Sequence, residues 1–307
     1  MTAVVQARAA SRDMPLLAGS LAVVAWGLGP LIVRSISASA PSIIVFRLGL
    51  SLPVMIGVAY LTGGRISLAV LRQALFPGVL FAFSMMAGFE SYKSTSIALA
   101  TLIPAVQPAL LLLVAFRLFG ERPSHRQVTL AVTALAGVFG VVLAAGNTSG
   151  TAMRGNVLAV VNLLLWTVYF VQVKRIRSGG VHSWSFLASV FIVASSIAVP
   201  WGLIVSNDIH AVGGLDWLLL GLMVFGPGLV GHGLMTWAQR HLDITVASAL
   251  TLASPVISAA GAWIIYNEGL RSMQMLFSAV VLCALAGIVV NVRTSAAAQT
   301  ALSGPPE

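Results

Sequence analysis

Charged side chains are scarce in this sequence. They make up 8% of its 307 residues, whereas a typical soluble domain carries about 25%. Hydrophobic residues account for 58% of the chain, and its mean hydropathy is +0.98. Water could not solvate a surface of this composition, so the composition excludes a soluble globular domain and predicts that the folded chain lies in lipid.

Cysteine is almost absent, and so are the motifs that bind cofactors. The single cysteine, Cys283, excludes an internal disulfide framework. The sequence contains neither an H-E-x-x-H motif nor a P-loop, so we expect no metal, no cofactor and no direct use of ATP. The formal net charge is +9, but the basic residues sit in short loops without interleaved aromatics, which argues against a nucleic-acid partner.

Long apolar runs are what the sequence has in abundance. A bilayer core requires roughly 20 apolar residues per helix, and backbone groups in lipid must be paired internally, so these runs should be helices. The connections between them are short and carry turn signals such as "TGGR" and "RSGGVHS". We predict ten transmembrane helices, over residues 16–33, 41–61, 71–89, 96–118, 126–146, 156–173, 184–205, 215–237, 244–265 and 273–292.

The distribution of Lys and Arg predicts the orientation of these helices. Most of the basic loop residues fall on the side of the N-terminus, whereas the other side holds only Arg34, Lys93, Arg154 and Arg271. The positive-inside rule therefore places both termini in the cytoplasm. We expect residues 1–13 to form a cytoplasmic N-terminal segment and residues 294–307 a disordered cytoplasmic tail.

The two halves of the chain echo each other. At one fixed shift Ile97 aligns with Ile244 and Pro108 with Pro255, and at a slightly smaller shift "WGLGPLIVR" (26–34) aligns with "WTVYFVQVK" (166–174). Each half holds five helices, an odd number, so the second half should enter the membrane inverted. Inverted repeats are typical of secondary transporters, whose substrate site lies between the repeats. We therefore predict an all-α integral membrane protein with repeats over 14–148 and 149–293 around a central cavity.

This pattern resembles the drug/metabolite transporter superfamily, and within it the EamA-type exporters. The resemblance rests on Trp26-Gly27, on Arg34 and Arg47, and on "YKSTSIALATLIPAVQP" (92–108) with its echo "DITVASALTLASP" (243–255). It covers roughly residues 14–293 and is greatest to bacterial amino-acid exporters, including the aromatic amino acid exporter group. It implies a non-enzymatic exporter of small organic metabolites in the bacterial inner membrane, acting by uniport or proton exchange.

Other functions are compatible with the same apolar composition. A multidrug or other metabolite exporter of this fold is the main alternative. A membrane enzyme would need polar catalytic groups clustered at one membrane face, and the scattered acidic residues and histidines offer no such cluster. The expected partners are a small-molecule substrate and the lipid bilayer, and no pattern in the sequence sets an oligomeric state.

Aromatic and polar residues at helical spacing mark the expected cavity wall. Asn162, Trp166 and Tyr169 share one face of the sixth span, with Trp26 as the repeat mate of Trp166. An aromatic stripe is often packing or a lipid-facing belt, but Asn162 would be costly toward lipid, so this face should point inward. Tyr92, the first residue of the motif at 92–108, is included among the candidate cavity residues.

The ninth span carries a polar stripe, and prolines interrupt several spans. The stripe consists of Thr245, Ser248, Thr251, Ser254 and Ser258, and it fits either helix packing or a cavity wall. Thr251 is its candidate substrate contact. The repeat mates Pro108 and Pro255 are the candidate hinges, because an interior proline removes a backbone hydrogen bond and bends its helix.

Few charges lie in or near the spans. For Arg47 the sequence slightly favours a side chain that reaches the outer interface over a partner for a substrate carboxylate. Glu90 and Lys93 are three residues apart on one helix, which predicts an ion pair between them. Glu121 and Glu268 are repeat mates, and for both a structural role at a helix N-terminus is favoured over gating.

The stretch "FGPGLVGHGLMTW" (225–237) contains both a nucleotide-like motif and a histidine. Gly226, Gly228 and Gly231 match G-x-G-x-x-G, but a dinucleotide loop follows a strand near water, whereas this one lies within a predicted span. The glycines should instead allow close helix packing. For His232 the sequence favours a neutral side chain hydrogen-bonded across helices over a proton carrier.

Overall fold

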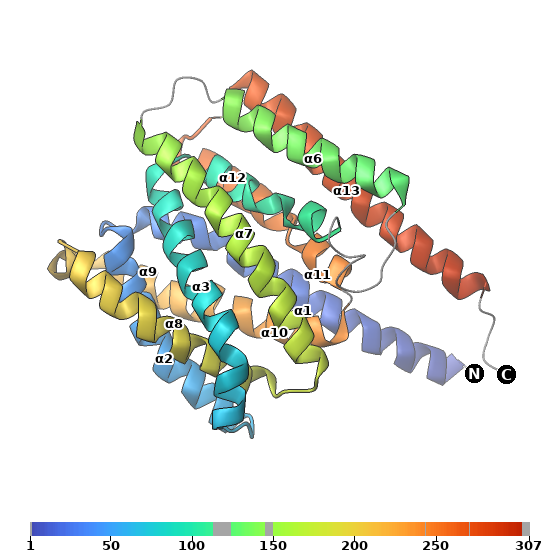
Figure 1. Cartoon of the computed structure of the whole chain (residues 1–307), viewed down its shortest axis with the longest axis horizontal. Helices are drawn as coiled ribbons and strands as arrows, with labels where there is room; N and C mark the ends of the chain where they lie inside the picture. Colours follow the sequence, from blue (N-terminus) through green and yellow to red (C-terminus); the bar gives the residue numbers. More distant parts are fainter. Residues whose placement is uncertain (1, 113–123, 145–149, 243, 270, 303–307) are drawn as a thin grey trace.

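The computed structural model describes residues 2–112, 124–144, 150–242, 244–269 and 271–302, and these residues form helices with no strand among them (Figure 1). Within the described residues, each of the ten predicted spans coincides with one helix or with a run of successive helical segments, which confirms the predicted all-helical membrane fold. The elements are α1 (Thr2–Ser35), α2 (Ala40–Leu61), α3 (Leu68–Ser94), α4 (Ile97–Leu102), η1 (Pro104–Val106), α6 (His125–Ala144), α7 (Gly150–Ser178), α8 (Ser183–Val205), η2 (Ile209–Ala211), α9 (Leu215–Met223), η3 (Val224–His232), α10 (Gly233–His241), α11 (Ile244–Leu250), α12 (Ala253–Tyr266) and α13 (Ser272–Leu302).

The length and the apolar surface of the helices fit a bilayer. Seven helices in the described part of the chain are long and apolar enough to cross a membrane, and shorter apolar helices occupy 97–112 and 272–284. Large apolar side chains such as Leu61, Ile204 and Ile264 are 75–87% exposed on the outside of the bundle. Exposed apolar surface of this extent would be unfavourable in water and is expected of a surface that faces lipid.

The end of the chain differs from the sequence expectation. Helix α13 continues to Leu302 and so covers most of the stretch 294–307, for which a disordered tail was predicted. Small residues such as the alanines at 296–298 are good helix formers, which explains why the helix can extend. Residues 303–307 lie outside the described part of the chain.

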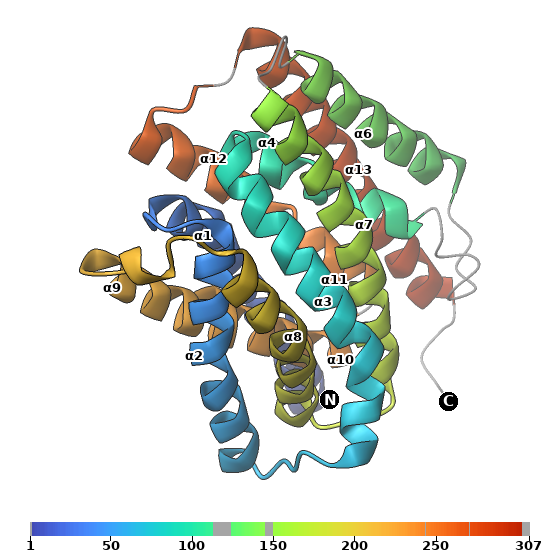
Figure 2. The same cartoon turned by 60° about the vertical axis from the view of Figure 1, so that its left-hand side comes forward.

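Helices from the two halves pack against one another throughout the bundle. Helix α3 of the first half lies along α7 and α8 of the second, α2 packs on α8, and α1 packs on η3, α10 and α12. Helices α6 and α13 pair with each other along one edge of the molecule (Figures 1 and 2). The last helices of the two repeats therefore occupy equivalent places, as an internal repeat requires.

Three of the spans are not continuous α-helices. In the fourth span, α4 ends at Leu102 and the short 3-10 turn η1 follows. In the ninth span, α11 ends at Leu250 and α12 begins at Ala253. In the eighth span, η3 is a π-helix that contains Pro227. Proline explains part of this irregularity because it has no N–H to donate, and π-helical segments occur frequently at functional sites.

The loop between α8 and α9 is attached to the start of α2. The carboxylate of Asp208 accepts hydrogen bonds from the backbone N–H and the hydroxyl of Ser39, both at 2.6 Å, and from the hydroxyl of Ser42 at 2.5 Å. A carboxylate at a helix N-terminus is favoured by the partial positive charge there. Burial raises the pKa of Asp208, but these hydrogen bonds and one from Ser206 outweigh that effect and lower the pKa to about 2.

Replacement of Asp208 by Asn should lower the unfolding temperature of the detergent-solubilised protein at neutral pH. Because the folded-state pKa of Asp208 lies below its ordinary value of 3.8, the stabilisation is fully present above that value and is lost as pH falls toward 2. The difference in unfolding temperature between the native protein and Asp208→Asn should therefore shrink over this window. A constant difference down to pH 2 would show that the carboxylate does not stabilise this loop.

Candidate functional site

A cavity of about 170 Å³ lies between the two halves of the bundle. Helices α1, α2 and α3 contribute to its wall from the first half, and α7, η3 and α12 from the second. The cavity brings together seven of the eight residues that the sequence proposed for it, namely Trp26, Arg47, Tyr92, Asn162, Trp166, His232 and Thr251.

Aromatic rings from both halves form the apolar part of the wall. The repeat mates Trp26 and Trp166 meet edge to face with ring centroids 5.5 Å apart, an arrangement that aromatic pairs prefer. The ring centroid of Phe81 lies 6.4 Å from that of Trp166 and 5.0 Å from that of His232. Tyr169, the eighth proposed residue, does not line the cavity; it is buried behind the wall, 4.9 Å from Trp166.

His232 is enclosed by these rings. Its side chain is 7% exposed, and the rings of Trp26, Phe81, Trp166 and Phe191 lie 5.0–6.1 Å from the imidazole centroid. No described residue forms a hydrogen bond with the imidazole. The expected hydrogen bond across helices is therefore not found within the described ranges, because the side chains that surround the ring are aromatic.

The glycines before His232 allow α1 to approach η3. A Cβ atom at Gly231 would lie 2.6 Å from Cδ1 and Nε1 of Trp26, and one at Gly228 would lie 3.0 Å from the carbonyl oxygen of Met223. A Cβ atom at Gly226 would meet nothing within 4 Å. The G-x-G-x-x-G spacing thus belongs to a packed membrane helix, where Gly231 makes room for the indole of Trp26.

Arg47 supplies the positive charge of the cavity. Its side chain is only 3% exposed, so the expectation that it reaches the membrane interface is wrong. The reason is that α2 packs against α3 and α8 and directs Arg47 inward, where Nη1 contacts the sulfur of Met85 at 3.1 Å and the guanidinium lies 5.4 Å from the ring centroid of Phe89. No carboxylate in the described part of the chain pairs with it.

Asn162 lies where α7 crosses α3. Its Oδ1 accepts a hydrogen bond of 2.6 Å from the hydroxyl of Ser84, and Gly88 leaves space for its amide, since a Cβ there would lie 3.1 Å from Nδ2. The inward direction that the sequence predicted for this face of the sixth span agrees with this position. Asn162 therefore joins the two halves and also contributes to the cavity wall.

The two broken helices reach the cavity at equivalent positions. Pro104 and Gln107 line it from the fourth span, and their repeat mates Thr251 and Ser254 line it from the ninth. Pro255 also lines the cavity, whereas its mate Pro108 is buried next to Gln107 without lining it.

The polar stripe of the ninth span has two uses. Thr251 and Ser254 face the cavity, whereas Ser258, farther along α12, donates a hydrogen bond of 2.7 Å to the carbonyl of Gly27 and so packs α12 on α1. The side chain of Thr245 lies outside the described residues. Both interpretations of the stripe therefore apply, each to a different part of it.

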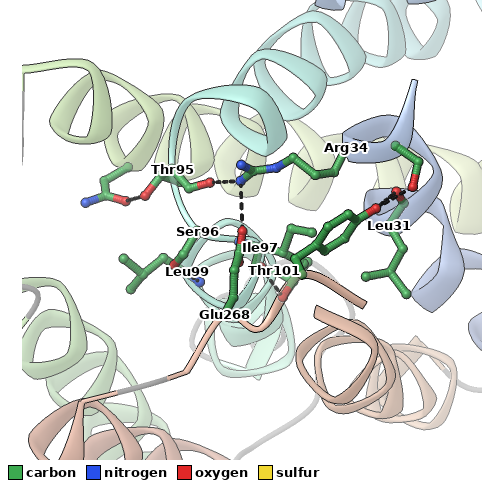
Figure 3. A network of polar contacts seen from close by, with 11 residues as sticks. Leu31, Arg34, Thr95, Ser96, Ile97, Leu99, Thr101 and Glu268 are labelled. Atoms are coloured by element: carbon green, nitrogen blue, oxygen red, sulfur yellow. Dashed lines mark hydrogen bonds and ion pairs between the residues drawn. The ribbon is translucent and has the colours of Figure 1, made fainter. Parts of the chain in front are cut away.

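A polar network joins the halves at one end of the bundle, called here the Arg34 end (Figure 3). Arg34 donates to the carbonyl of Thr95 and forms an ion pair of 3.5 Å with Glu268, whose carboxylate also accepts from the backbone N–H of Ile97 at 3.0 Å. The carboxylate of Glu268 thus lies at a helix N-terminus. The helix is α4, which belongs to the other half of the chain. Tyr266 adds a hydrogen bond of 2.7 Å to the carbonyl of Leu31.

A related contact lies at the opposite end, called here the Lys174 end. Lys174, the repeat mate of Arg34, donates to the carbonyl of Leu242 at 2.6 Å, and Leu242 is the repeat mate of Thr95. The same kind of contact, from a basic helix end to an equivalent carbonyl, thus recurs at both ends. Glu121, the repeat mate of Glu268, lies outside the described residues.

The predicted ion pair between Glu90 and Lys93 does not form. Glu90 instead pairs with Arg154 at 3.1 Å, and Lys93 donates to the carbonyl of Ile36. Helix α3 packs closely against α7, so a basic residue on α7 is a nearer partner for Glu90 than the neighbour on its own helix.

Several lining residues were not foreseen from the sequence. Phe81, Ser84, Met85 and Phe89 come from α3, whose middle part, residues 74–89, contains Ser84 as its one polar side chain and so gives little sign of which face is inward. Gln107 had a usable signal: it is a polar side chain between two prolines in an apolar run, and the repeat aligns it with Ser254.

Comparisons with known proteins agree with this architecture. The model of a family described as the EamA-like transporter family matches residues 14–143 and again residues 153–290. A protein of Escherichia coli (strain K12) named "Probable amino-acid metabolite efflux pump" is 23% identical over 293 residues, covering 89% of this chain and 92% of its own length. A solved crystal structure that is 21% identical aligns with a TM-score of 0.69 over 92% of this chain and 99% of its own, and so shares the fold.

Substitution of Gly231 by Ala should destabilise the protein and displace the indole of Trp26, because the added Cβ would overlap that ring. Overpacking of this kind costs about 1–3 kcal/mol, which can be measured as a change in unfolding free energy in detergent. Gly226→Ala is the matched control, since it adds the same atom to the same helix in open space, and its stability should be unchanged. Equal effects of the two substitutions would contradict the assigned packing role of Gly231.

Proposed function

The chain belongs to the EamA-like transporter family, and from that membership we propose that it is a secondary transporter that exports small organic metabolites across a bacterial inner membrane. The proposed substrates are amino acids, aromatic ones included, and the proposed mechanism is alternating access. The name of the Escherichia coli relative, a probable amino-acid metabolite efflux pump, supports this substrate class. The proposed function is transport and not catalysis. We also propose that both termini lie in the cytoplasm.

One observation carries the proposal: a cavity enclosed by both halves combines an aromatic wall with a single buried cation. Trp26, Trp166 and Phe81 would hold an apolar group, while Arg47 would attract a carboxylate. Ligand sites are commonly built in this way, from an apolar enclosure with few polar groups. An amino acid with an apolar side chain matches both parts of the wall.

The same features favour amino acids over the drugs that a multidrug exporter would carry. The cavity of about 170 Å³ is smaller than the roughly 300–1,000 Å³ typical of sites for drug-sized ligands. Arg47 would repel cationic drugs, and no acidic side chain is among the described lining residues to attract them.

The contacts at the two ends suggest how access could alternate. Arg34 and Glu268 would close the Arg34 end, since their ion pair bridges the two repeats that must separate for a solute to pass. The contact of Lys174 with Leu242 lies within the second repeat and would stiffen that repeat at the Lys174 end. Rocking of one repeat against the other is the motion expected of inverted-repeat transporters. By the predicted orientation the Arg34 end faces outside. We assign His232 to the wall rather than to proton exchange, because no described polar group contacts its ring.

A liposome assay tests the proposed function. The purified protein should catalyse saturable counterflow of labelled phenylalanine or leucine, whereas product formation would indicate an enzyme and an ohmic current a channel. Joint replacement of Trp26, Phe81 and Trp166, the rings that line the cavity, by alanine should reduce counterflow by at least about tenfold, since contacts with aromatic rings contribute about 0.5–1.5 kcal/mol each beyond buried area. Trp263→Ala, at a tryptophan that is 66% exposed, is the control and should transport normally. Unchanged transport by the triple variant would remove these rings from the site.

Loss of the charge on Glu268 should open the Arg34 end more often. In protein that carries Cys283→Ser and a reporter at the cavity, Thr101→Cys, the substitution Glu268→Gln should speed labelling by a membrane-impermeant maleimide from outside. The expected increase is roughly two- to fivefold, because partly exposed ion pairs contribute about 0.2–1 kcal/mol. Glu90→Gln removes the other ion pair, beside α3 and α7, and should leave the labelling rate unchanged. A slower or equal rate for Glu268→Gln would argue against a gate at this end.

A further inference from the structure

Three side-chain nitrogens in the cavity wall carry hydrogens but have no acceptor within the described part of the chain. They are Nε1 of Trp26, Nε of Arg47 and Nε2 of Gln107, and all three residues line the cavity. Buried polar groups without a partner are uncommon in folded proteins and cost free energy. Of the ten such atoms in the described part of the chain, these three belong to residues of the cavity wall, where a ligand can supply the missing acceptors.

All three unsatisfied groups are donors. The indole N–H of Trp26 and the guanidinium of Arg47 can only donate, and the unsatisfied atom of Gln107 is its amide nitrogen. Gln107 and Arg47 are nearly completely buried, with 1% and 3% of their surfaces exposed, so bulk water does not satisfy them. The ligand that complements this wall is therefore rich in acceptor oxygens.

The charge of the cavity wall also favours a ligand that supplies acceptor oxygens. Within the described residues, the two ion pairs are Arg34 with Glu268 and Arg154 with Glu90, and neither includes Arg47. The contacts of Arg47 with Met85 and Phe89 are favourable but do not neutralise its charge. An isolated buried cation is unfavourable, so an anionic group on the ligand would remove the largest electrostatic cost in the cavity.

A ligand ammonium group would find no equivalent partner. No Asp or Glu is among the described lining residues. The hydroxyl groups of Ser84 and Thr251 donate to Asn162 and to the carbonyl of Ser248, so their oxygens remain acceptors, but neutral ones. An ammonium group would meet neutral oxygens and aromatic faces, and Arg47 would repel it.

We propose that the cavity recognises organic carboxylates with an apolar side group, and that the amino group of an amino acid is not required. The carboxylate binds at Arg47, while Trp26 and Gln107 donate to acceptor oxygens of the ligand. This inference rests on the proposed function, because it specifies the substrate class of the same cavity. It extends that class to apolar carboxylic acids that lack an amino group.

Three solutes that share one aromatic skeleton test the carboxylate and the ammonium group of the ligand separately. Phenylalanine carries both, 3-phenylpropionate only the carboxylate and 2-phenylethylamine only the ammonium. Binding is measured by calorimetry on the detergent-solubilised protein, and each solute is also tested as an inhibitor of phenylalanine counterflow in liposomes. The acid should bind within about threefold of phenylalanine, and the amine at least about tenfold more weakly, because hydrogen bonds to charged groups are the strong ones. An amine that binds as well as the acid would overturn the inference.

Conservative variants test whether the three donors recognise the carboxylic acid. Trp26→Phe keeps an aromatic ring without the N–H, and Gln107→Met keeps the approximate length without the amide; each should weaken binding of the acid about three- to tenfold without changing that of the amine. Gln239→Met, at a buried glutamine outside the cavity, is the control and should bind the acid normally. Arg47→Met should abolish acid binding and raise the unfolding temperature of the ligand-free protein, because it removes an unpaired buried charge.

The two assays keep this inference distinct from the proposed function. If the acid binds and depends on Arg47 but phenylalanine shows no counterflow, the carboxylate site stands and the transport proposal fails. If phenylalanine is transported but the amine competes as well as the acid, transport stands and the carboxylate inference fails. Acid binding that persists at full strength in Arg47→Met would also reject it.

Discussion

The requirement that every backbone N–H and C=O be paired within the protein governs this structure, because the lipid around it offers no partners. The long helices α1, α2, α3, α7 and α8 meet most of the requirement by themselves, although α1, α2, α3 and α8 contain interior prolines that each remove one donor. The irregular segments, at η1, at η3 and between α11 and α12, all border one internal cavity, although η3 also has exposed side chains on its outer face. Pro104, Pro227 and Pro255 all line that cavity, so the helices lose their regularity beside the proposed substrate site.

The internal repeat explains why one cavity contains matched parts from both halves. Trp26 contacts Trp166 edge to face in the cavity wall, and the basic ends of α1 and α7 contact equivalent carbonyls at opposite ends of the bundle. Charge breaks this symmetry: Arg47 lies in the first half, and the repeat supplies no second cation to the described wall. The symmetric elements fit the proposed rocking motion, and the asymmetric ones fit recognition of a solute with one charged end and one apolar end.

The sequence predicted the helices, the repeat and seven residues of the cavity wall, because these depend on local periodicity and on the high cost of polar groups in lipid. Trp26, Trp166 and Asn162 were found in this way. The sequence contains little indication of which face of α3 is inward, since residues 74–89 of that helix contain a single polar side chain, Ser84, and so Phe81 was missed. Arg47 was expected at the interface and Glu90 was paired with Lys93, because both expectations considered one helix at a time. The true partners come from neighbouring helices, whose rotation and depth a single sequence does not fix.

The most direct test of the account is an experimental structure of the protein with phenylalanine bound, determined by cryo-electron microscopy. The account predicts ligand density in the cavity between the halves, with the ring against Trp26 and Trp166 and the carboxylate toward Arg47. Ligand density elsewhere, for example in the groove beside Glu90 and Arg154, with the central cavity empty, would contradict it.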